Sequence, residues 1–238
     1  MRDGWGKPHD IELKGAINLV TEVDRASEAI IIEQLTRATP EYDILAEESG
    51  AHARGSAFCW VIDPVDGTTN YAHHFPYFAV SIGLEENGES IAGVVYDPIL
   101  DQLFSATRGG GAFLNGEKIS CSHASELSAS VLATGLIYDQ WESDRGLPEM
   151  MRMIKSARSL RINGCAALDC ANVACGGLDA YCDTGLFPWD LSAGRLLVTE
   201  AGGAFKQYGD LARTDLTYCI ASNGRIHAAL EQLLTTKH

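Results

Sequence analysis

Apolar and polar residues alternate along this chain with two periodicities, one typical of helices and one typical of strands. The clearest helical stretch covers residues 24–38, where apolar residues recur roughly at helical spacing, and Pro40 lies just beyond its end. The segment before it, Thr21-Glu22-Val23-Asp24, fits a capping box. We therefore predict an amphipathic helix from Asp24 to Ala38.

Strand-like runs dominate the middle of the chain, and strands and helices alternate after it. Asn87-Gly88 and Asn115-Gly116 are typical hairpin turns, so we expect antiparallel strands between Tyr77 and Phe113. The other predicted strands cover residues 42–46, 58–62, 131–136, 178–183 and 218–222. The other predicted helices cover residues 149–157, 163–175 and 225–234, together with one that opens at Phe187 and ends at Gly202.

Two acidic residues follow directly on the apolar run from Phe58 to Ile62. Pro64 stands between Asp63 and Asp66. Proline fixes its own φ and pushes the preceding residue towards an extended conformation, so we expect the strand to stop and turn here. The strand would then end in two fixed carboxylates, which are side chains that bind hard divalent cations.

The next residues favour the start of a helix. Gly67 permits a backbone that a side chain would obstruct, and Thr68 or Thr69 can cap a following helix. Because helix starts bind phosphate, this stretch predicts a site where a metal and a phosphate ester meet. An ordinary turn is the alternative, since Asp, Pro and Gly each favour turns for local reasons, and this stretch alone gives the two readings equal weight.

Composition narrows the classes of function. The 238 residues suit one large domain or two intimate subdomains, and the 46% of hydrophobic residues can form a sizeable core. The net charge of −14, from 32 acidic and 18 basic residues, argues against nucleic acid or an anionic membrane as the main partner. An acidic protein that handles phosphate esters needs cations to screen its own field, which agrees with a metal site.

Cysteine usage and the absence of long apolar runs indicate a location. The seven cysteines are scattered without Cys-x-x-Cys spacing, so we expect neither a disulfide framework nor a structural zinc site. This cysteine usage is typical of a protein from a reducing compartment. Residues 1–10 lack the apolar core of a signal sequence, and no run is long enough to cross a bilayer. We expect a cytoplasmic protein without a membrane partner.

The chain resembles the signature of the inositol monophosphatase family at Asp63-Pro64-Val65-Asp66-Gly67-Thr68-Thr69-Asn70-Tyr71, followed by His74, Pro76 and the run 78–83. That family comprises Mg²⁺-dependent, lithium-sensitive phosphatases of small phosphomonoesters. The resemblance extends over nearly the whole chain from Lys14 onward. It implies an α+β fold, the layered αβαβα sandwich of the inositol monophosphatase and fructose-1,6-bisphosphatase type.

This resemblance also implies how the chain is organised. We expect a single domain over residues 1–238 with two intimate subdomains, approximately 1–120 and 121–238, and a homodimer. Family members usually carry a long N-terminal helix that this chain largely lacks. Either the chain is trimmed, or a neighbouring subunit or another element covers the exposed core face.

Four acidic side chains are implied to hold metal ions. One Mg²⁺ would use Glu47, Asp63 and the backbone carbonyl of Val65, a second would use Asp63, Asp66 and Asp190, and a weaker third would share Glu47 with waters. Taken on spacing alone, Glu47 is more typical of a solvated loop residue, and Asp190 is equally typical of a helix cap.

The resemblance also implies which residues act on the substrate. Thr68 and Asp24 would orient and deprotonate the attacking water, and the N–H groups of Gly67 and Thr68 would hold phosphate oxygens. Capping of the helix is the alternative role of Asp24. The residues implied to contact the polyol are Gly164, Cys165, Ala166 and Asp183, with Asp66 and Asp190 shared. Arg161 and Lys14 match basic residues of the family. For each of them, a contact with the substrate and a structural salt bridge are equally plausible roles.

The implied function is the hydrolysis of myo-inositol 1-phosphate to inositol and phosphate by a metal-activated water. The substrate would be a small phosphomonoester and the cofactor Mg²⁺. The alternatives are a phosphatase of another small ester (fructose 1,6-bisphosphate, histidinol phosphate or 3′-phosphoadenosine 5′-phosphate), or a regulatory binding partner of the transcription machinery.

Overall fold

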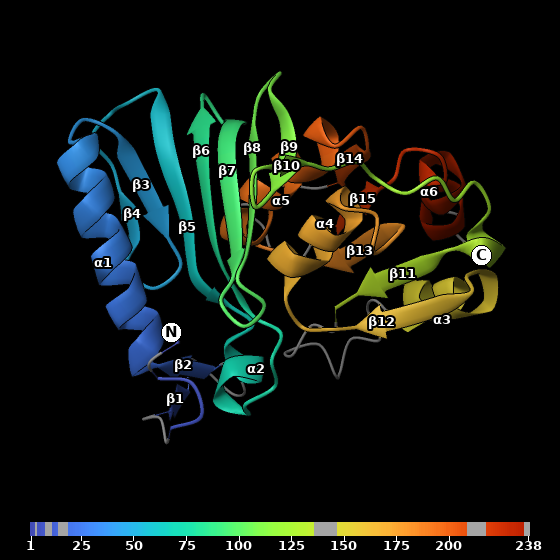
Figure 1. Cartoon of the computed structure of the whole chain (residues 1–238), viewed down its shortest axis with the longest axis horizontal. Coiled ribbons are helices and arrows are strands. Elements are labelled where there is room, and N and C mark those ends of the chain that lie inside the picture. Colours follow the sequence, from blue (N-terminus) through green and yellow to red (C-terminus); the bar gives the residue numbers. More distant parts are fainter. Residues whose placement is uncertain (3, 8–10, 14–18, 136–146, 209–217, 236–238) are drawn as a thin grey trace.

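Two β-sheets and the helices on their faces build the fold (Figure 1). The computed structural model describes residues 1–2, 4–7, 11–13, 19–135, 147–208 and 218–235. The helices are α1 (Glu22–Ala38), α2 (Thr68–Ala72), α3 (Leu147–Ser156), α4 (Ala166–Ala174), α5 (Pro188–Glu200) and α6 (His227–Thr235), with a 3₁₀ turn at Leu127–Ala129.

The larger sheet has eight strands in the order β10-β9-β8-β7-β6-β5-β3-β4. Its strands are β3 (Asp43–Ala46), β4 (Gly50–His52), β5 (Phe58–Asp66), β6 (Ala79–Glu86), β7 (Glu89–Asp97), β8 (Gln102–Thr107), β9 (Gly111–Leu114) and β10 (Glu117–Lys118). Every neighbouring pair is antiparallel except β3 and β5, which are parallel. The carboxyl ends of β3 and β5 therefore lie at the same edge of the sheet.

The smaller sheet has five strands in the order β12-β11-β13-β15-β14. Its strands are β11 (Val131–Thr134), β12 (Ser159–Ile162), β13 (Ala180–Thr184), β14 (Ala204–Tyr208) and β15 (Tyr218–Ser222). A separate hairpin pairs β1 (Ile11–Leu13) with β2 (Leu19–Thr21).

The layers follow the order helix, sheet, helices, sheet, helices (Figure 1). α1 lies on the outer face of the large sheet, α4 and α5 lie between the two sheets, and α3 and α6 cover the far face of the small sheet. This arrangement confirms the predicted α+β fold and its layered αβαβα sandwich. The proposed division near residue 120 stays a prediction.

Local signals predicted several of these elements. Thr21 and Asp24 form the capping box of α1, with Thr21 Oγ1 accepting from the Val23 N–H and Asp24 Oδ2 accepting from the Thr21 N–H at 2.9 Å. The Asn87-Gly88 turn, with φ values of 50° and 83°, joins β6 to β7, and Asn115-Gly116 joins β9 to β10 in the same conformation. Both hairpins and the helix are confirmed.

The predicted end of the strand at Ile62 was wrong, because β5 continues through Pro64 to Asp66. The ladder to β6 pairs Asp63 with Ser81 and Asp66 with Ala79, so two residues of β5 lie opposite one residue of β6. This irregularity accommodates a proline, which has no N–H to donate. As a result both acids belong to the strand and point into the protein.

The predicted cap of α2 was also wrong. Gly67 is the N-cap with a left-handed φ of 94°, and no side chain caps the helix. Thr68 is instead the first helical residue, which leaves its hydroxyl available for contacts elsewhere. The predicted start of α4 at Asn163 was too early, because Gly164 has a positive φ of 76° and the helix begins at Ala166.

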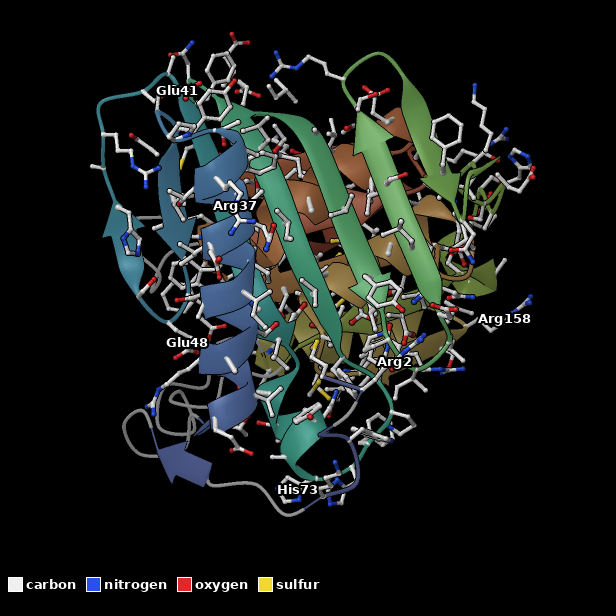
Figure 2. The ribbon with its side chains drawn as sticks, turned by 60° about the vertical axis from the view of Figure 1, so that its left-hand side comes forward. Arg2, Arg37, Glu41, Glu48, His73 and Arg158 are labelled. Carbon is white, nitrogen blue, oxygen red and sulfur yellow. The ribbon has the colours of Figure 1, made fainter. Side chains whose placement is uncertain are left out.

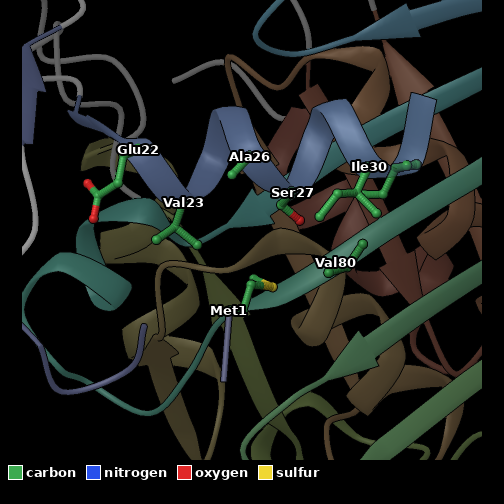
Figure 3. A pocket seen from close by; sticks show the side chains of 8 residues that line it. Met1, Glu22, Val23, Ala26, Ser27, Ile30 and Val80 are labelled. Atoms are coloured by element: carbon green, nitrogen blue, oxygen red, sulfur yellow. The ribbon is translucent and has the colours of Figure 1, made fainter. Parts of the chain in front are cut away.

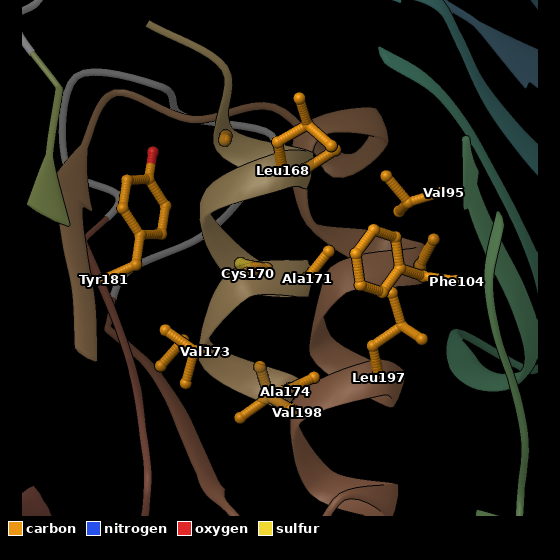
Figure 4. Close-up of a cluster of buried hydrophobic side chains, with 14 of the residues drawn as sticks. Val95, Phe104, Leu168, Cys170, Ala171, Val173, Ala174, Tyr181, Leu197 and Val198 are labelled. Atoms are coloured by element: carbon orange, nitrogen blue, oxygen red, sulfur yellow. The ribbon is translucent and has the colours of Figure 1, made fainter. Parts of the chain in front are cut away.

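The main core fills the layer between the sheets (Figure 4). Small residues let α5 approach the large sheet closely. A Cβ atom on Gly83 would lie 2.2 Å from Ser192 Oγ, and one on Gly93 would lie 2.9 Å from Ala193 Cα. These two glycines set the distance between α5 and strands β6 and β7, and so the position of the residues at the start of α5.

The outer face of the large sheet is only partly covered. Figure 2 shows α1 lying across one side of this face, with β6, β7 and β8 beside it. An apolar groove of about 330 Å³ runs along α1 between Met1, Val23, Ile30 and Val80 (Figure 3).

The described helices include none with the length and apolar character needed to cross a membrane. All seven cysteines are free thiols.

We expect Gly93→Ala to destabilise the fold by about 1–3 kcal/mol, because the added methyl group meets the backbone of α5 rather than a side chain that can turn away. Chemical denaturation followed by circular dichroism measures this. The matched control on the same strand is Glu89→Ala, an exposed position where a change within about 0.5 kcal/mol is expected. Equal stability of the two variants would contradict the close packing of α5.

Candidate active site

The two acids of β5 are buried at the end of the strand. Asp63 is 2% exposed and Asp66 is 8% exposed. Asp63 Oδ1 accepts a hydrogen bond from the Val65 N–H at 3.0 Å, and Asp66 Oδ2 accepts from the Ala167 N–H at 2.5 Å. Asp66 thus faces the first turn of α4. Burial raises the pKa of Asp66 to about 6, although the N–H groups of α4 oppose this rise.

Glu47 reaches the same place from β3. Its N–H donates to the Ile62 carbonyl at 3.1 Å, which extends the parallel ladder between β3 and β5 by one bond. The Glu47 side chain lies close enough to Asp63 to influence the ionisation of its carboxyl. Burial first, and then the charges of Glu47, Asp66 and Asp190, raise the pKa of Asp63 well above its usual range.

Asp190 comes from the first turn of α5, where it is the third helical residue. Its Oδ2 accepts a hydrogen bond from the Phe187 N–H at 2.6 Å, so the capping role is confirmed. Burial, and then the charge of Asp66, raise the pKa of Asp190 well above its usual value, and Glu47 adds to this rise. A cap and a metal ligand are compatible roles, and the second stays a prediction.

These four carboxylates suit a divalent cation by their chemistry. Mg²⁺ prefers hard oxygen ligands such as carboxylates. A bound cation would also relieve the repulsion between carboxylates that are removed from water. Within the described ranges, however, no three His, Cys, Asp or Glu side chains are already arranged as a metal site. Three of the carboxylates bond backbone N–H groups instead, so the ligand assignments stay predictions.

Asp24 and Thr68 are brought together from α1 and α2. Asp24 is fully buried, and its Oδ1 accepts from Thr68 Oγ1 at 2.9 Å. Thr68 Oγ1 also lies 3.0 Å from the Val65 carbonyl oxygen. The other carboxylate oxygen of Asp24 serves the capping box, so the capping role is confirmed, and the catalytic role stays a prediction.

The residues predicted to contact the polyol lie on two elements. Gly164, Cys165 and Ala166 form the turn before α4 and its first residue, and they lie next to Asp66. Asp183 is the last residue but one of β13, where its Oδ2 accepts from Tyr181 Oη at 2.8 Å. Burial raises the pKa of Asp183 to about 6, and the Tyr181 hydroxyl opposes the rise.

Of the two basic residues named from the sequence, only Arg161 lies in the described part of the chain, and its contacts are within β12. The guanidinium of Arg161 contacts Ser159 Oγ and lies 3.3 Å from the Leu160 carbonyl oxygen. Lys14 lies outside the described residues.

A partly buried network, which the sequence did not reveal, holds the Gly164 turn. Asn70 Nδ2 donates to the Asn163 carbonyl at 2.8 Å and to the Tyr77 carbonyl at 2.7 Å. Asp169 Oδ1 accepts from Tyr77 Oη and from Asn163 Nδ2, both at 2.7 Å. The signal in the sequence was an acidic residue inside the mostly apolar helix α4.

Comparison with known proteins identifies the family. The model of the inositol monophosphatase family matches residues 1–237. The chain belongs to the inositol monophosphatase family.

Several relatives support this assignment. An inositol monophosphatase of Dictyostelium discoideum is 48% identical over 81% of this chain and 73% of its own length, and an inositol-1-monophosphatase of Synechocystis is 45% identical over 97% and 82%. The solved structure of inositol monophosphatase from Anabaena matches with a TM-score of 0.84 and 44% identity, covering 89% of this chain and 85% of that one. Membership of the inositol monophosphatase family makes this chain a phosphatase.

Asp169 gives a pH-dependent test of the partly buried network. Burial raises its pKa to about 7, so its folded pKa lies above the unfolded value of about 4. The stability that the protonated form contributes is complete below about pH 4 and is lost as the pH rises towards 7. We expect Asp169→Asn, whose amide oxygen can accept both hydrogen bonds, to resist unfolding better than wild type at pH 8 by a few kcal/mol.

Denaturant unfolding in EDTA at pH 4 and pH 8 measures this difference. The advantage of Asp169→Asn should shrink between pH 8 and pH 4. A difference in unfolding free energy that does not change with pH would show that Asp169 keeps an ordinary pKa.

Proposed function

We propose that this phosphatase hydrolyses a small phosphomonoester, with myo-inositol 1-phosphate as its principal substrate, and that Mg²⁺ is the metal it requires. The observation that carries the proposal is the meeting of Asp63 with Glu47, Asp66 and Asp190 in a desolvated place, where their charges raise the pKa of Asp63. A divalent cation is the partner that such a group of carboxylates needs.

The carboxylates of Glu47, Asp63, Asp66 and Asp190 would hold Mg²⁺, with the Val65 carbonyl as a further ligand. When bound there, Mg²⁺ supplies Lewis acidity towards the phosphate ester and favours ionisation of the attacking water. Burial of Asp63 and Asp66 keeps competing solvent away from their oxygens. Backbone hydrogen bonds to Asp63, Asp66 and Asp190 would hold these three carboxylates in place before the substrate arrives.

The Asp24–Thr68 pair would handle the proton of the attacking water. Asp24 Oδ1 and Thr68 Oγ1 are 2.9 Å apart, so a water bound to the threonine hydroxyl can pass its proton to the carboxylate. The N–H groups of Gly67 and Thr68 would bind phosphate oxygens. Attack opposite the ester oxygen then releases the alcohol and inorganic phosphate.

The alcohol half of the substrate would lie between the Gly164 turn and Asp183. Backbone groups of Gly164, Cys165 and Ala166, together with the carboxylates of Asp183 and Asp190, suit the hydroxyl groups of a polyol, because they present several acceptors within one small area. The Asp169 network would hold the Gly164 turn for this purpose.

The expected activity is Mg²⁺-dependent phosphate release that Li⁺ inhibits. We expect myo-inositol 1-phosphate to be hydrolysed with a higher kcat/KM than fructose 1,6-bisphosphate, histidinol phosphate or 3′-phosphoadenosine 5′-phosphate. Phosphate release from this panel, with and without Mg²⁺ and Li⁺, measures it. If another ester of the panel has the highest kcat/KM, that ester is the principal substrate in place of myo-inositol 1-phosphate. A rate of phosphate release that does not depend on Mg²⁺ would refute the metal site.

Replacing the central carboxylate separates activity from stability. We expect Asp63→Asn to lower kcat/KM about 100-fold or more, because the charge that holds the cation is lost. In EDTA the same variant should be at least as stable as wild type, since the amide carries no buried charge beside Glu47, Asp66 and Asp190. The control is Asp101→Asn, which replaces an exposed carboxylate that is not among the proposed ligands. Wild-type turnover by folded Asp63→Asn would overturn the assignment.

A second candidate function comes from other relatives. The chain is 40% identical to the Nus factor SuhB of Escherichia coli, over 91% of this chain and 82% of that protein. We therefore propose, as an addition to catalysis, docking on the transcription machinery. Co-sedimentation with purified bacterial RNA polymerase elongation complexes tests it, and Asp63→Asn should bind as wild type does if docking is independent of the metal site.

The homodimer and the cytoplasmic location complete the proposal. The free thiols of all seven cysteines agree with a reducing compartment. Sedimentation equilibrium measures the number of subunits.

A further inference from the structure

Glu28 is a buried acid that the mechanism above does not use. It lies on α1 and is 3% exposed. Its Oε2 accepts a hydrogen bond from the Glu48 N–H at 2.8 Å, and its Oε1 accepts from the Ser49 N–H at 2.9 Å. Both donors belong to the residues that directly follow Glu47. One carboxylate therefore binds two consecutive peptide groups of that loop, which fixes their orientation.

The loop is held from its other side by the large sheet. The Glu47 N–H donates to the Ile62 carbonyl at 3.1 Å, and β3 pairs with β5 up to Ala46 and Ile62. Glu47 thus stands between two fixed points, the ladder to β5 before it and the Glu28 carboxylate after it. Its side chain can meet Asp63 because the backbone on both sides is held.

Glu28 lies on the same face of α1 as Asp24. The two acids are four residues apart on α1, so they lie on the same face one turn apart. Asp24 binds the hydroxyl of Thr68, and Ser27 Oγ, between them, lies 3.4 Å from the Pro64 carbonyl oxygen. Figure 2 shows Glu48 beside α1. One face of α1 therefore contacts both the loop after β3 and the end of β5, which fixes their positions relative to each other.

We propose that Glu28 is a positioning residue that orients Glu47 for the divalent cation and so sets the affinity of the site for it. The inference rests on the proposed metal-dependent function. Groups that orient metal ligands through a second layer of hydrogen bonds typically change metal affinity 10–100-fold when they are replaced.

Glu28→Gln is the informative substitution. Glutamine keeps the shape of the side chain but has one acceptor oxygen, and its NH₂ group would face a backbone N–H, so one of the two hydrogen bonds is lost. The matched control is Glu33→Gln on the same helix, which removes an exposed ion pair with Arg37. Glu28→Asp serves as a second variant, because it keeps the charge and withdraws the oxygens by one methylene group.

Mg²⁺ alone is titrated into each metal-free protein by calorimetry, and hydrogen exchange at the Glu48 and Ser49 amides is followed in parallel. We expect Glu28→Gln and Glu28→Asp to bind Mg²⁺ 10–100-fold more weakly than wild type and to lose amide protection at these two residues. Glu33→Gln should match wild type in both measurements. In the phosphatase assay, excess Mg²⁺ should restore the rate of the Glu28 variants and leave their substrate KM unchanged.

Four results would overturn the inference. Wild-type Mg²⁺ affinity in either folded Glu28 variant would do so alone, and so would unchanged amide protection at Glu48 and Ser49. A wild-type protein that binds no Mg²⁺ would refute the proposed function itself, and the inference with it. A raised substrate KM that excess Mg²⁺ does not correct would assign Glu28 a structural role only.

Discussion

Like charges buried at one edge of the large sheet are the constraint on which the rest of this structure depends. Because β3 and β5 run parallel, the ladder that pairs Ala46 with Ile62 places Glu47 next to Asp63. Removing a carboxylate from water disfavours its charged form, and a neighbouring carboxylate disfavours it further. Both effects act on Asp63 and raise its pKa. The surrounding elements supply the hydrogen bonds and dipoles that stabilise these neighbouring carboxylates.

Backbone N–H groups provide much of that tolerance, and they come from three separate elements. Asp63 is bonded by Val65 within the irregular end of β5, Asp66 by Ala167 in the first turn of α4, and Asp190 by Phe187 at the start of α5. Helix starts carry partial positive charge, so α4 and α5 both direct favourable dipoles at the acids. The close approach of α5 to Gly83 and Gly93 is therefore a condition for the site as well as for the core.

Features encoded by neighbouring residues could be predicted from the sequence, and features set by distant partners could not. The capping box at Thr21 and the Asn87-Gly88 hairpin need only a few adjacent residues, and both were correct. The end of β5 was mistaken because pairing with β6 carries the strand past Pro64. Glu28 and Asp169 escaped notice because their partners lie 20 and 92 positions away. The ligand set came from family resemblance, since spacing alone made Glu47 a loop acid.

The same repulsion links the stability of this chain to its activity. If the proposed cation binds the folded form and not the unfolded form, it would stabilise the folded chain by an amount that grows with the logarithm of the cation concentration. The carboxylates that disfavour the metal-free fold would then contribute to stability once the ion is bound. Neutral residues at Asp63 or Asp190 would pack with less conflict, and a chain selected for stability alone would carry them. Asp63 and Asp190 are instead acids, each held by a backbone donor, which is what the proposed metal site would require.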